Sequence, residues 1–390
     1  MRPIHHLVLF ALLSHATLSA ARVAVTLYAV SLDSAAVVVG VLIGLFGAPA
    51  VLASVPMGKM VDRRPARLPM LACIFLSAVG SLLPFMWEGL APLFITSLFV
   101  GGAYFTLYII NSNLAGRYGG PEHRAGNFAL MHMGLSVANG IGPLIAGFGI
   151  DHLGHAHTFL VIAVLPLLAL ALVLLGKLPL LDEVPARRED TKTGGSFVEL
   201  LRDPAIQPVY VITVLFTLVW DTFMVLAPIY GAALDLSASR IGIIISTFAF
   251  ASFAVRVFTT PLTRLFSNWQ LLLLSLGVAA ACCLGFGMSS NFAVLLLLAF
   301  GIGFGQGLGG PIGNAALFDV APPHRSGEAL GVRTAIMMSC QTVLPLLAGA
   351  ASSLVGVAPL FWCSGIASFA GAWFYRGLWR SRPPLKPKAP

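Results

Sequence analysis

The sequence predicts an all-helical membrane protein with twelve transmembrane helices, arranged as two related bundles of six. Of its 390 residues, 58% are hydrophobic and only 10% are charged, whereas soluble domains are about a quarter charged. The apolar residues fall into about twelve stretches, each long enough to cross a hydrocarbon core of ~30 Å as a helix. The two halves of the chain also resemble each other at an offset of about 201 residues, which indicates an internal duplication.

Charge is unevenly distributed along the chain. The net charge is +8, yet most Lys and Arg residues lie in alternate loops and in the tails, whereas the opposite loops carry mostly acids and histidines. An excess of basic residues marks the cytoplasmic side of a membrane protein. We therefore expect an integral protein of a bacterial inner membrane, with both termini in the cytoplasm and no nucleic-acid partner.

The cysteines and motifs argue against several other functions. All five cysteines fall within apolar segments and lack the spacing of a metal site or a disulfide framework. No GxxxxGK[ST] phosphate-binding loop is present. We expect no bound metal, no cofactor and no enzymatic activity.

A polar segment divides the chain. Residues 181–207 form the one long stretch that reads as water-soluble, and we expect it to be a cytoplasmic linker. It separates an N-terminal bundle at 1–180 from a C-terminal bundle at 208–378, and a basic tail follows at 379–390. Ser196 and Glu199 form a capping-box pattern, which predicts a short amphipathic helix within the linker.

The first predicted helix spans roughly residues 6 to 29. A signal peptide is the alternative for the first 20 residues. However, Leu27–Asp33 matches Ile229–Asp235 in the second half, so this region has a counterpart that cannot be a signal. His15 and Arg22 fall on one face of the helix, and a polar face on a membrane-spanning helix points into the bundle.

The later helices carry both the repeat and further polar residues. The turn Pro121–Gly126 recurs as Pro322–Gly327. The helix from roughly residue 92 to 115 places several polar side chains on one face, and the helix from roughly 209 to 231 carries a buried acid. Polar residues inside apolar segments, which are the candidates for substrate contact, are His15, Arg22, Tyr104, Tyr108, Asn111, Thr217, Trp220, Gln306 and Asn314. Three further candidates are His132, Arg256 and Arg333. For the two arginines we favour snorkelling or capping at a membrane face.

The turn after the second helix carries a family motif. Gly58, Asp62, Arg63 and Arg67 fit the form G-x-x-x-D-R-x-x-x-R between two spanning helices. On this basis the chain resembles the major facilitator superfamily over essentially its whole length. The resemblance implies two pseudo-symmetric six-helix bundles, transport by alternating access through one cavity between the two halves, and a conformational switch at this turn.

A second motif is similar to that of the proton-coupled drug antiporters of this superfamily. It is the run around Gly142 and Pro143, which the resemblance also assigns to conformational change. The chain departs from the pattern of these antiporters at two positions. Ser97 stands where they usually carry an arginine, and Arg22 stands where many carry an acid. The proton-coupling residue must therefore be argued from this chain.

Asp221 is the candidate for proton coupling. An ionised group near the bilayer centre costs at least ~2.5 to 3.5 kcal/mol, so it needs a partner or a role. Burial raises the pKa of a carboxyl group and a nearby arginine lowers it, so a conformational change that alternates these surroundings produces a proton carrier. A static pair with Arg22 remains the alternative for Asp221, and Arg22 either forms that pair or presents a cation to an anionic substrate.

The sequence thus favours a secondary active transporter that exports a small organic molecule by proton-coupled antiport. The alternative is an importer or exporter of an anionic metabolite, such as a carboxylate or a siderophore-like compound, that uses Arg22 and Arg333. The expected partners are the small-molecule substrate, protons and the lipid bilayer, and we expect a monomer.

Overall fold

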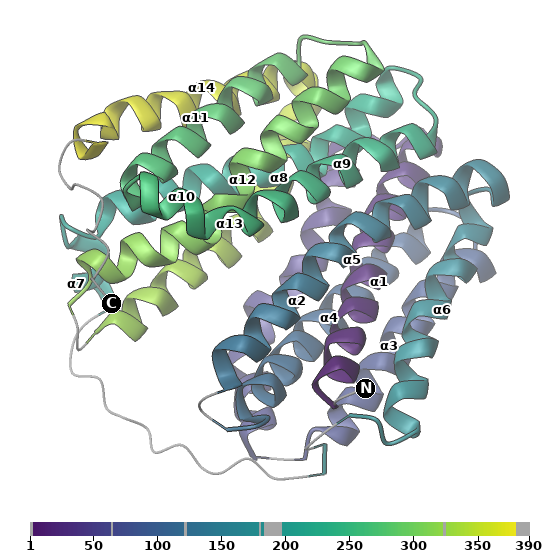
Figure 1. Cartoon of the computed structure of the whole chain (residues 1–390). Coiled ribbons are helices and arrows are strands. Elements are labelled where there is room, and N and C mark those ends of the chain that lie inside the picture. The colour runs from purple at the N-terminus through teal and green to yellow at the C-terminus, as the bar shows by residue number, and fades with distance from the viewer. Residues whose placement is uncertain are drawn as a thin grey trace. The chain divides into compact units, whose positions relative to one another are not determined.

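A computed structural model describes residues 3–63, 65–120, 123–178, 181–182, 197–322 and 325–379 of the chain, and this part is almost entirely helical. Within each half, consecutive long helices run in opposite directions and are joined by short connections (Figure 1). The six long helices of the first half are α1 (Pro3–Ser31), α2 (Ala36–Arg63), α3 (Arg67–Met86), α4 (Leu90–Arg117), α5 (Arg124–Leu153) and α6 (His155–Leu174).

The second half repeats this series with three short helical segments added. Its long helices are α8 (Gln207–Ala233), α9 (Ala238–Val257), α11 (Asn268–Phe286), α12 (Phe292–Val320), α13 (Ser326–Val355) and α14 (Ala358–Phe374). The short segments are α7 (Phe197–Arg202), α10 (Thr259–Leu265) and the 3-10 helix η2 (Tyr375–Trp379).

Ten of the described helices are long and apolar enough to cross a membrane. The other two spans are α2, whose apolar first half runs from Ala36 to Pro49, and α14, which has 17 residues. The protein is therefore an all-helical membrane protein with twelve transmembrane helices, as the sequence predicted.

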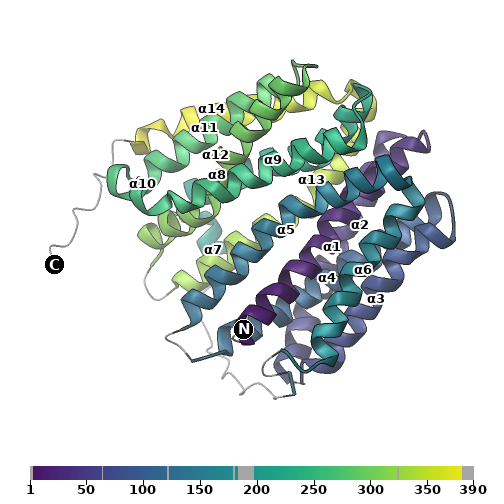
Figure 2. The same ribbon diagram turned by 45° about the vertical axis from the view of Figure 1, so that its right-hand side comes forward.

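The chain forms two compact units. The first comprises Met1–Glu189 and Pro228–Ser246, and the second comprises Asp190–Ala227 and Thr247–Pro390. In the first unit α1 packs against α4, α5 and α6, and Figure 2 shows α1 alongside α5. In the second unit α11 packs against α12 and α14. The predicted boundaries at 180 and 208 stay a prediction, and residues 183–196 of the linker and 380–390 of the tail lie outside the described residues.

Local geometry repeats between the two halves. Asp33 and Asp235 end α1 and α8 with left-handed φ values of 53° and 55°. Gly154 and Gly356 join the last two helices of each half with φ values of 84° and 82°. Positive φ favours glycine, and aspartate tolerates it better than most residues do. The same turns thus recur 202 residues apart.

The two halves differ where the motif turn of the first half has its counterpart. The helix that corresponds to α2 is interrupted at Phe258, between α9 and α10. Pro261 explains the break, because its ring clashes with the carbonyl four residues earlier, at Val257, and it has no N–H to donate.

The short helix α7 packs against the start of α13. Glu199 lies 3.0 Å from the Arg325 guanidinium, and Leu200 is buried in the apolar core of the second unit. The hydrogen bonds that Arg325 donates to Glu328, and then to Glu199, raise the pKa of Arg325. The linker helix is therefore attached to the second unit by an ion pair and by the apolar side chains of Leu200 and Leu201.

Candidate functional site

A group of polar side chains, here called the His15 cluster, joins three helices of the first unit: His15 on α1, Tyr104 on α4 and Asn139 on α5. His15 Nδ1 lies 2.6 Å from the Tyr104 hydroxyl, and His15 Nε2 lies 3.0 Å from Asn139 Oδ1. Because an amide oxygen only accepts, Nε2 carries a proton, and in the neutral ring Nδ1 accepts from Tyr104. The three side chains thus form one continuous chain of hydrogen bonds across α1, α4 and α5.

Arg22 lies two turns along α1 from His15. Its guanidinium sits 5.7 Å from the centre of the Phe46 ring on α2, and its charge acts on both His15 and Tyr104. A cation over an aromatic face gains electrostatic attraction. The first unit thus holds a cation inside its helices near the His15 imidazole.

Two other predicted contact residues lie on the same helix as Tyr104. The rings of Tyr104 and Tyr108 are 6.2 Å apart. Asn111 is 2% exposed, and its Oδ1 has no hydrogen-bond partner among the described residues. An unsatisfied buried acceptor costs free energy, so Asn111 has an unused capacity to bind a donor.

A second group, the Arg333 cluster, lies in the second unit and consists of Arg333, Thr213, Asn314 and the Gly309 carbonyl. Arg333 is 5% exposed. Its nitrogens donate to Thr213 Oγ1 at 2.9 Å, Asn314 Oδ1 at 2.6 Å and the Gly309 oxygen at 3.2 Å. All three acceptors are neutral, and no carboxylate pairs with this guanidinium in the part of the chain that the structure covers.

This burial differs from the snorkelling expected for Arg333. A snorkelling side chain extends towards the membrane surface, whereas Arg333 turns inward to three acceptors. The side chain can turn inward because residue 313 is a glycine. A Cβ at that position would come within 2.7 Å of the guanidinium. Arg256 is also directed inward, since its Nε donates to the Gly307 carbonyl at 3.2 Å.

One face of α8 connects the Arg333 cluster with Asp221. Thr213, Thr217 and Asp221 are spaced four residues apart, so they lie on one side of the helix. Thr217 donates to the Thr213 carbonyl at 2.9 Å. Asp221 is 7% exposed and lies close enough to the Cys340 thiol of α13 to interact electrostatically. A carboxyl group and a guanidinium are thus buried along the same pair of helices, about 12 Å apart along α8.

Two more predicted residues of the second unit pack against neighbouring helices. Trp220 meets the Phe248 ring edge-on, with 5.0 Å between the ring centres. Gln306 is 6% exposed and donates to the Phe216 carbonyl at 3.1 Å. These contacts place both side chains at helix interfaces within the unit.

The run around Gly142 and Pro143 brings helices close together. A Cβ on Gly142 would come within 2.6 Å of Ser19 Cβ on α1. On another side of α5, a Cβ on Gly242 of α9 would lie 2.5 Å from the Pro143 oxygen. At the end of α5, the Asp151 carboxylate accepts from the first two N–H groups of α9 at 3.0 and 2.8 Å. Small residues allow such close approach between membrane helices.

Of the remaining predicted residues, the structure describes the side chains of Arg67 and His132, which belong to neither cluster. Gly58, Asp62 and Arg63 fall in a part of α2 whose side chains lie outside the described residues. Arg67 pairs with Asp182 at 3.2 Å, and both side chains are largely exposed. His132 is exposed on α5.

Sequence reasoning missed Asn139 and Asp151. Asn139 is one of few polar residues inside the apolar part of α5, which was an available signal. Asp151 lies next to His152 at the end of α5, and nothing in the sequence around it indicates that it caps another helix. In the described residues no group of three or more His, Cys, Asp or Glu side chains is placed to hold a metal ion.

The fold and these clusters define a class of protein: a duplicated helical membrane protein with cationic, acidic and imidazole groups inside its spanning helices. The profile of the Major Facilitator Superfamily matches residues 7–288 and again residues 209–390. The chain belongs to this superfamily. It is an integral membrane protein and a secondary transporter of small molecules.

Solved structures of transporters share the fold. A POT family transporter in complex with 5-aminolevulinic acid aligns with a TM-score of 0.79 at 15% identity over 97% of this chain and 96% of its own. A peptide transporter POT in complex with sulfate gives 0.78 at 16% identity over 96% and 94%. A bacterial homolog of the human lysosomal transporter Spinster, inward-facing and occupied, gives 0.74 at 13% identity over 100% of both chains. At these identities the likeness concerns the fold alone.

Proposed function

We propose that the protein is a proton-coupled antiporter of the drug:proton antiporter-like branch, which exports a small organic molecule across a bacterial inner membrane by alternating access. In this proposal both termini lie in the cytoplasm and the transporter acts as a monomer. Asp221 is the proton carrier.

The burial of Asp221 carries the proposal. This carboxyl group is 7% exposed and sits in the middle of a helix that crosses the membrane. A charge at that depth is costly, so a carboxyl group there gains stability by taking up a proton when its surroundings become less polar. Thr217, one turn away, and Cys340 supply polar neighbours that a conformational change can move.

Transport driven by a proton gradient tests the proposal. Proteoliposomes that contain the purified protein are loaded with cationic dyes, and an inward proton gradient is imposed by a pH jump. We expect dye export that stops when an ionophore collapses the gradient. Export that is unaffected by the ionophore would exclude proton coupling.

The anionic alternative is supported by the Arg333 cluster. A buried guanidinium that is held only by neutral acceptors keeps its full positive charge, and an anionic substrate would be attracted to it. Arg22 is the second cation of this alternative. A ligand-stabilisation screen of the purified protein, with matched anionic and cationic libraries, distinguishes the two proposals. Stabilisation by anions that is lost in both Arg333→Gln and Arg22→Ala favours the alternative, and stabilisation by cations alone opposes it.

A further inference from the structure

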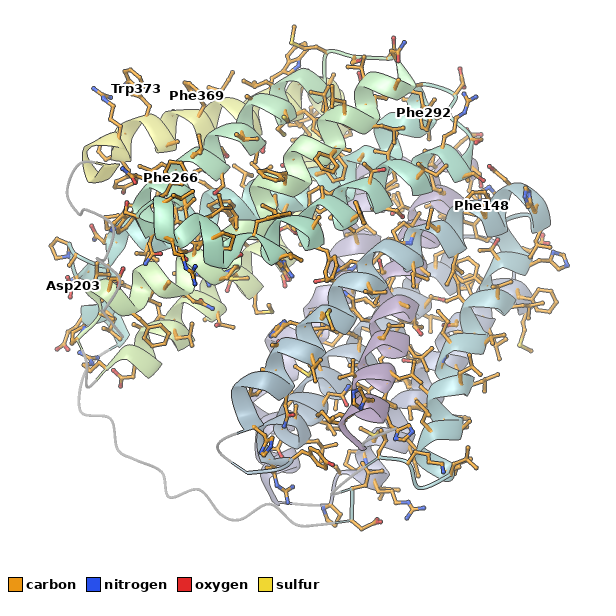
Figure 3. The ribbon with its side chains drawn as sticks, viewed as in Figure 1. Phe148, Asp203, Phe266, Phe292, Phe369 and Trp373 are labelled. Atoms are coloured by element: carbon orange, nitrogen blue, oxygen red, sulfur yellow. The ribbon has the colours of Figure 1, made fainter. Side chains whose placement is uncertain are left out.

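Two hollows flank the end of α14 on the surface of the second unit. The larger has a volume of about 930 Å³ and the smaller about 420 Å³, and both are lined by Phe369, Trp373 and Arg376. The helices α11 and α14 lie side by side in both views (Figures 1 and 2). Figure 3 shows Phe369 and Trp373 projecting outward from α14. We call these two hollows the α14 groove.

Small residues of α11 form part of the wall of the smaller hollow. Gly277 lines the smaller hollow, and a Cβ built on it would meet no atom within 4 Å. Ala281 follows one turn later on the same face. Large apolar side chains form the walls, since Phe369 is 52% exposed and Trp373 is 60% exposed. The α14 groove is therefore lined mainly by apolar side chains and is open to the outside.

A cation lies at one end of the α14 groove. The guanidinium of Arg376 sits 4.0 Å from the centre of the Trp373 ring, and one of its nitrogens donates to the Trp373 carbonyl at 3.1 Å. A guanidinium has five N–H donors in a planar fork that fits phosphate. No Asp or Glu occurs in residues 329–390, so this stretch supplies no internal acid to compete for Arg376.

The position of Arg376 matches the depth of lipid headgroups. The helix α14 has 17 residues, which corresponds to about 25 Å at 1.5 Å per residue, close to the thickness of the hydrocarbon core. Arg376 lies just past its last residue, beside Trp373 and Tyr375, and such aromatic residues mark the membrane interface. The chain continues with Arg380, Arg382, Lys386 and Lys388, which add positive charge in sequence.

We propose that the α14 groove binds an anionic phospholipid. One acyl chain lies against Phe369, Trp373 and the small residues of α11, and the phosphate accepts hydrogen bonds from Arg376. The site is separate from the buried clusters, and it does not depend on the proposed transport function. The occupant is a bilayer lipid because an apolar slot with a cation at its interfacial end matches a lipid in both shape and charge.

Native mass spectrometry of the full-length protein, titrated with phosphatidylglycerol or with phosphatidylcholine of the same acyl chains, tests the site. We expect the wild type to retain phosphatidylglycerol in preference to phosphatidylcholine. A single basic residue near the membrane surface accounts for about a fivefold difference in affinity, so Arg376→Gln should lower the preference about fivefold. Gly277→Leu should reduce retention of both lipids, since its side chain would occupy the hollow, where a Cβ meets no atom within 4 Å. Gly310→Leu is the matched control, because this helical glycine also faces open space but lies outside the groove.

The effects of Arg376→Gln and Gly277→Leu on retention of phosphatidylglycerol should be non-additive, because both substitutions act on one bound lipid. Arg382→Gln is the control for general attraction by the tail, and its effect should add to that of Gly277→Leu. The proposal is overturned if both lipids bind equally to the wild type. It is also overturned if Gly277→Leu leaves the retention of both lipids unchanged, or if a dimer forms that loses its lipid, which would show that a second copy covers the groove.

Discussion

Replacing Gly101 by alanine should push α2 and α4 apart. A Cβ on Gly101 would lie 2.2 Å from the Phe46 carbonyl oxygen and 2.5 Å from its Cα, so the obstacle is backbone that no rotamer change can move. Ordinary contacts need roughly 3.5 Å, so the helices must separate by about 1 Å. Overpacking of this kind costs about 1–3 kcal/mol, and alanine gains up to about 1 kcal/mol of helix propensity. With rigid backbone as the obstacle, we take the upper end and expect a net loss of ~2 kcal/mol.

Thermal unfolding of the purified protein in detergent measures this loss, which corresponds to a decrease in apparent Tm of ~4–8 °C. Gly303→Ala should behave alike, because its Cβ would lie 2.1 Å from the Phe248 oxygen in the equivalent position of the second unit. Gly310→Ala is the control, since no atom lies within 4 Å of its Cβ, and it should unfold at or slightly above the wild-type temperature. If Gly101→Ala and Gly303→Ala unfold at or above that temperature, the close crossings do not exist as described.

Three other outcomes follow from the local geometry. Tyr104→Phe removes the hydroxyl that lies 2.6 Å from His15 Nδ1 and should destabilise the protein by about 1–3 kcal/mol, because a buried polar group loses its partner; denaturation in detergent measures this. Asp151→Ala removes the acceptor of two N–H groups at the start of α9 and should cost about 1 kcal/mol of stability. Hydrogen exchange at those two amides should become faster, and slower exchange would contradict the capping contact. The raised pKa of Arg325 keeps this residue charged throughout neutral and mildly alkaline pH, so the effect of Arg325→Gln on Tm should be equal at about pH 7 and about pH 9 and smaller in about 1 M salt.

The fold was predictable because lipid leaves few choices. Backbone groups in a bilayer must bond within their own segment, so hydrophobic length alone identifies the spans, and the repeat relates the two halves. The matched segments Leu27–Asp33 and Ile229–Asp235 both end in a residue with left-handed φ, Asp33 and Asp235. Sequence patterns therefore predicted both the class of fold and its internal duplication.

The polar contacts were less predictable, because the partner of a polar residue depends on how helices cross. Helical spacing placed His15 and Tyr104 on inward faces but gave no information that Asn139 completes their cluster. Arg333 was expected to snorkel, since its distance from a helix end favours that, and only the packing around Gly313 reveals an inward pocket for its guanidinium. Spacing along one helix determines a face, and the neighbouring helix determines the chemistry of that face.

The central claim is that Asp221 carries the transported proton, and a comparison of two transport modes in proteoliposomes tests it most directly. For a ligand identified by the stabilisation screen, Asp221→Asn should keep substrate exchange at equal pH, because exchange needs no net proton movement, and should lose accumulation driven by a proton gradient. Asp235→Asn is the control, because this exposed aspartate occupies a left-handed turn that asparagine also tolerates, and it should keep both modes. Gradient-driven accumulation by Asp221→Asn at the wild-type rate would contradict the account.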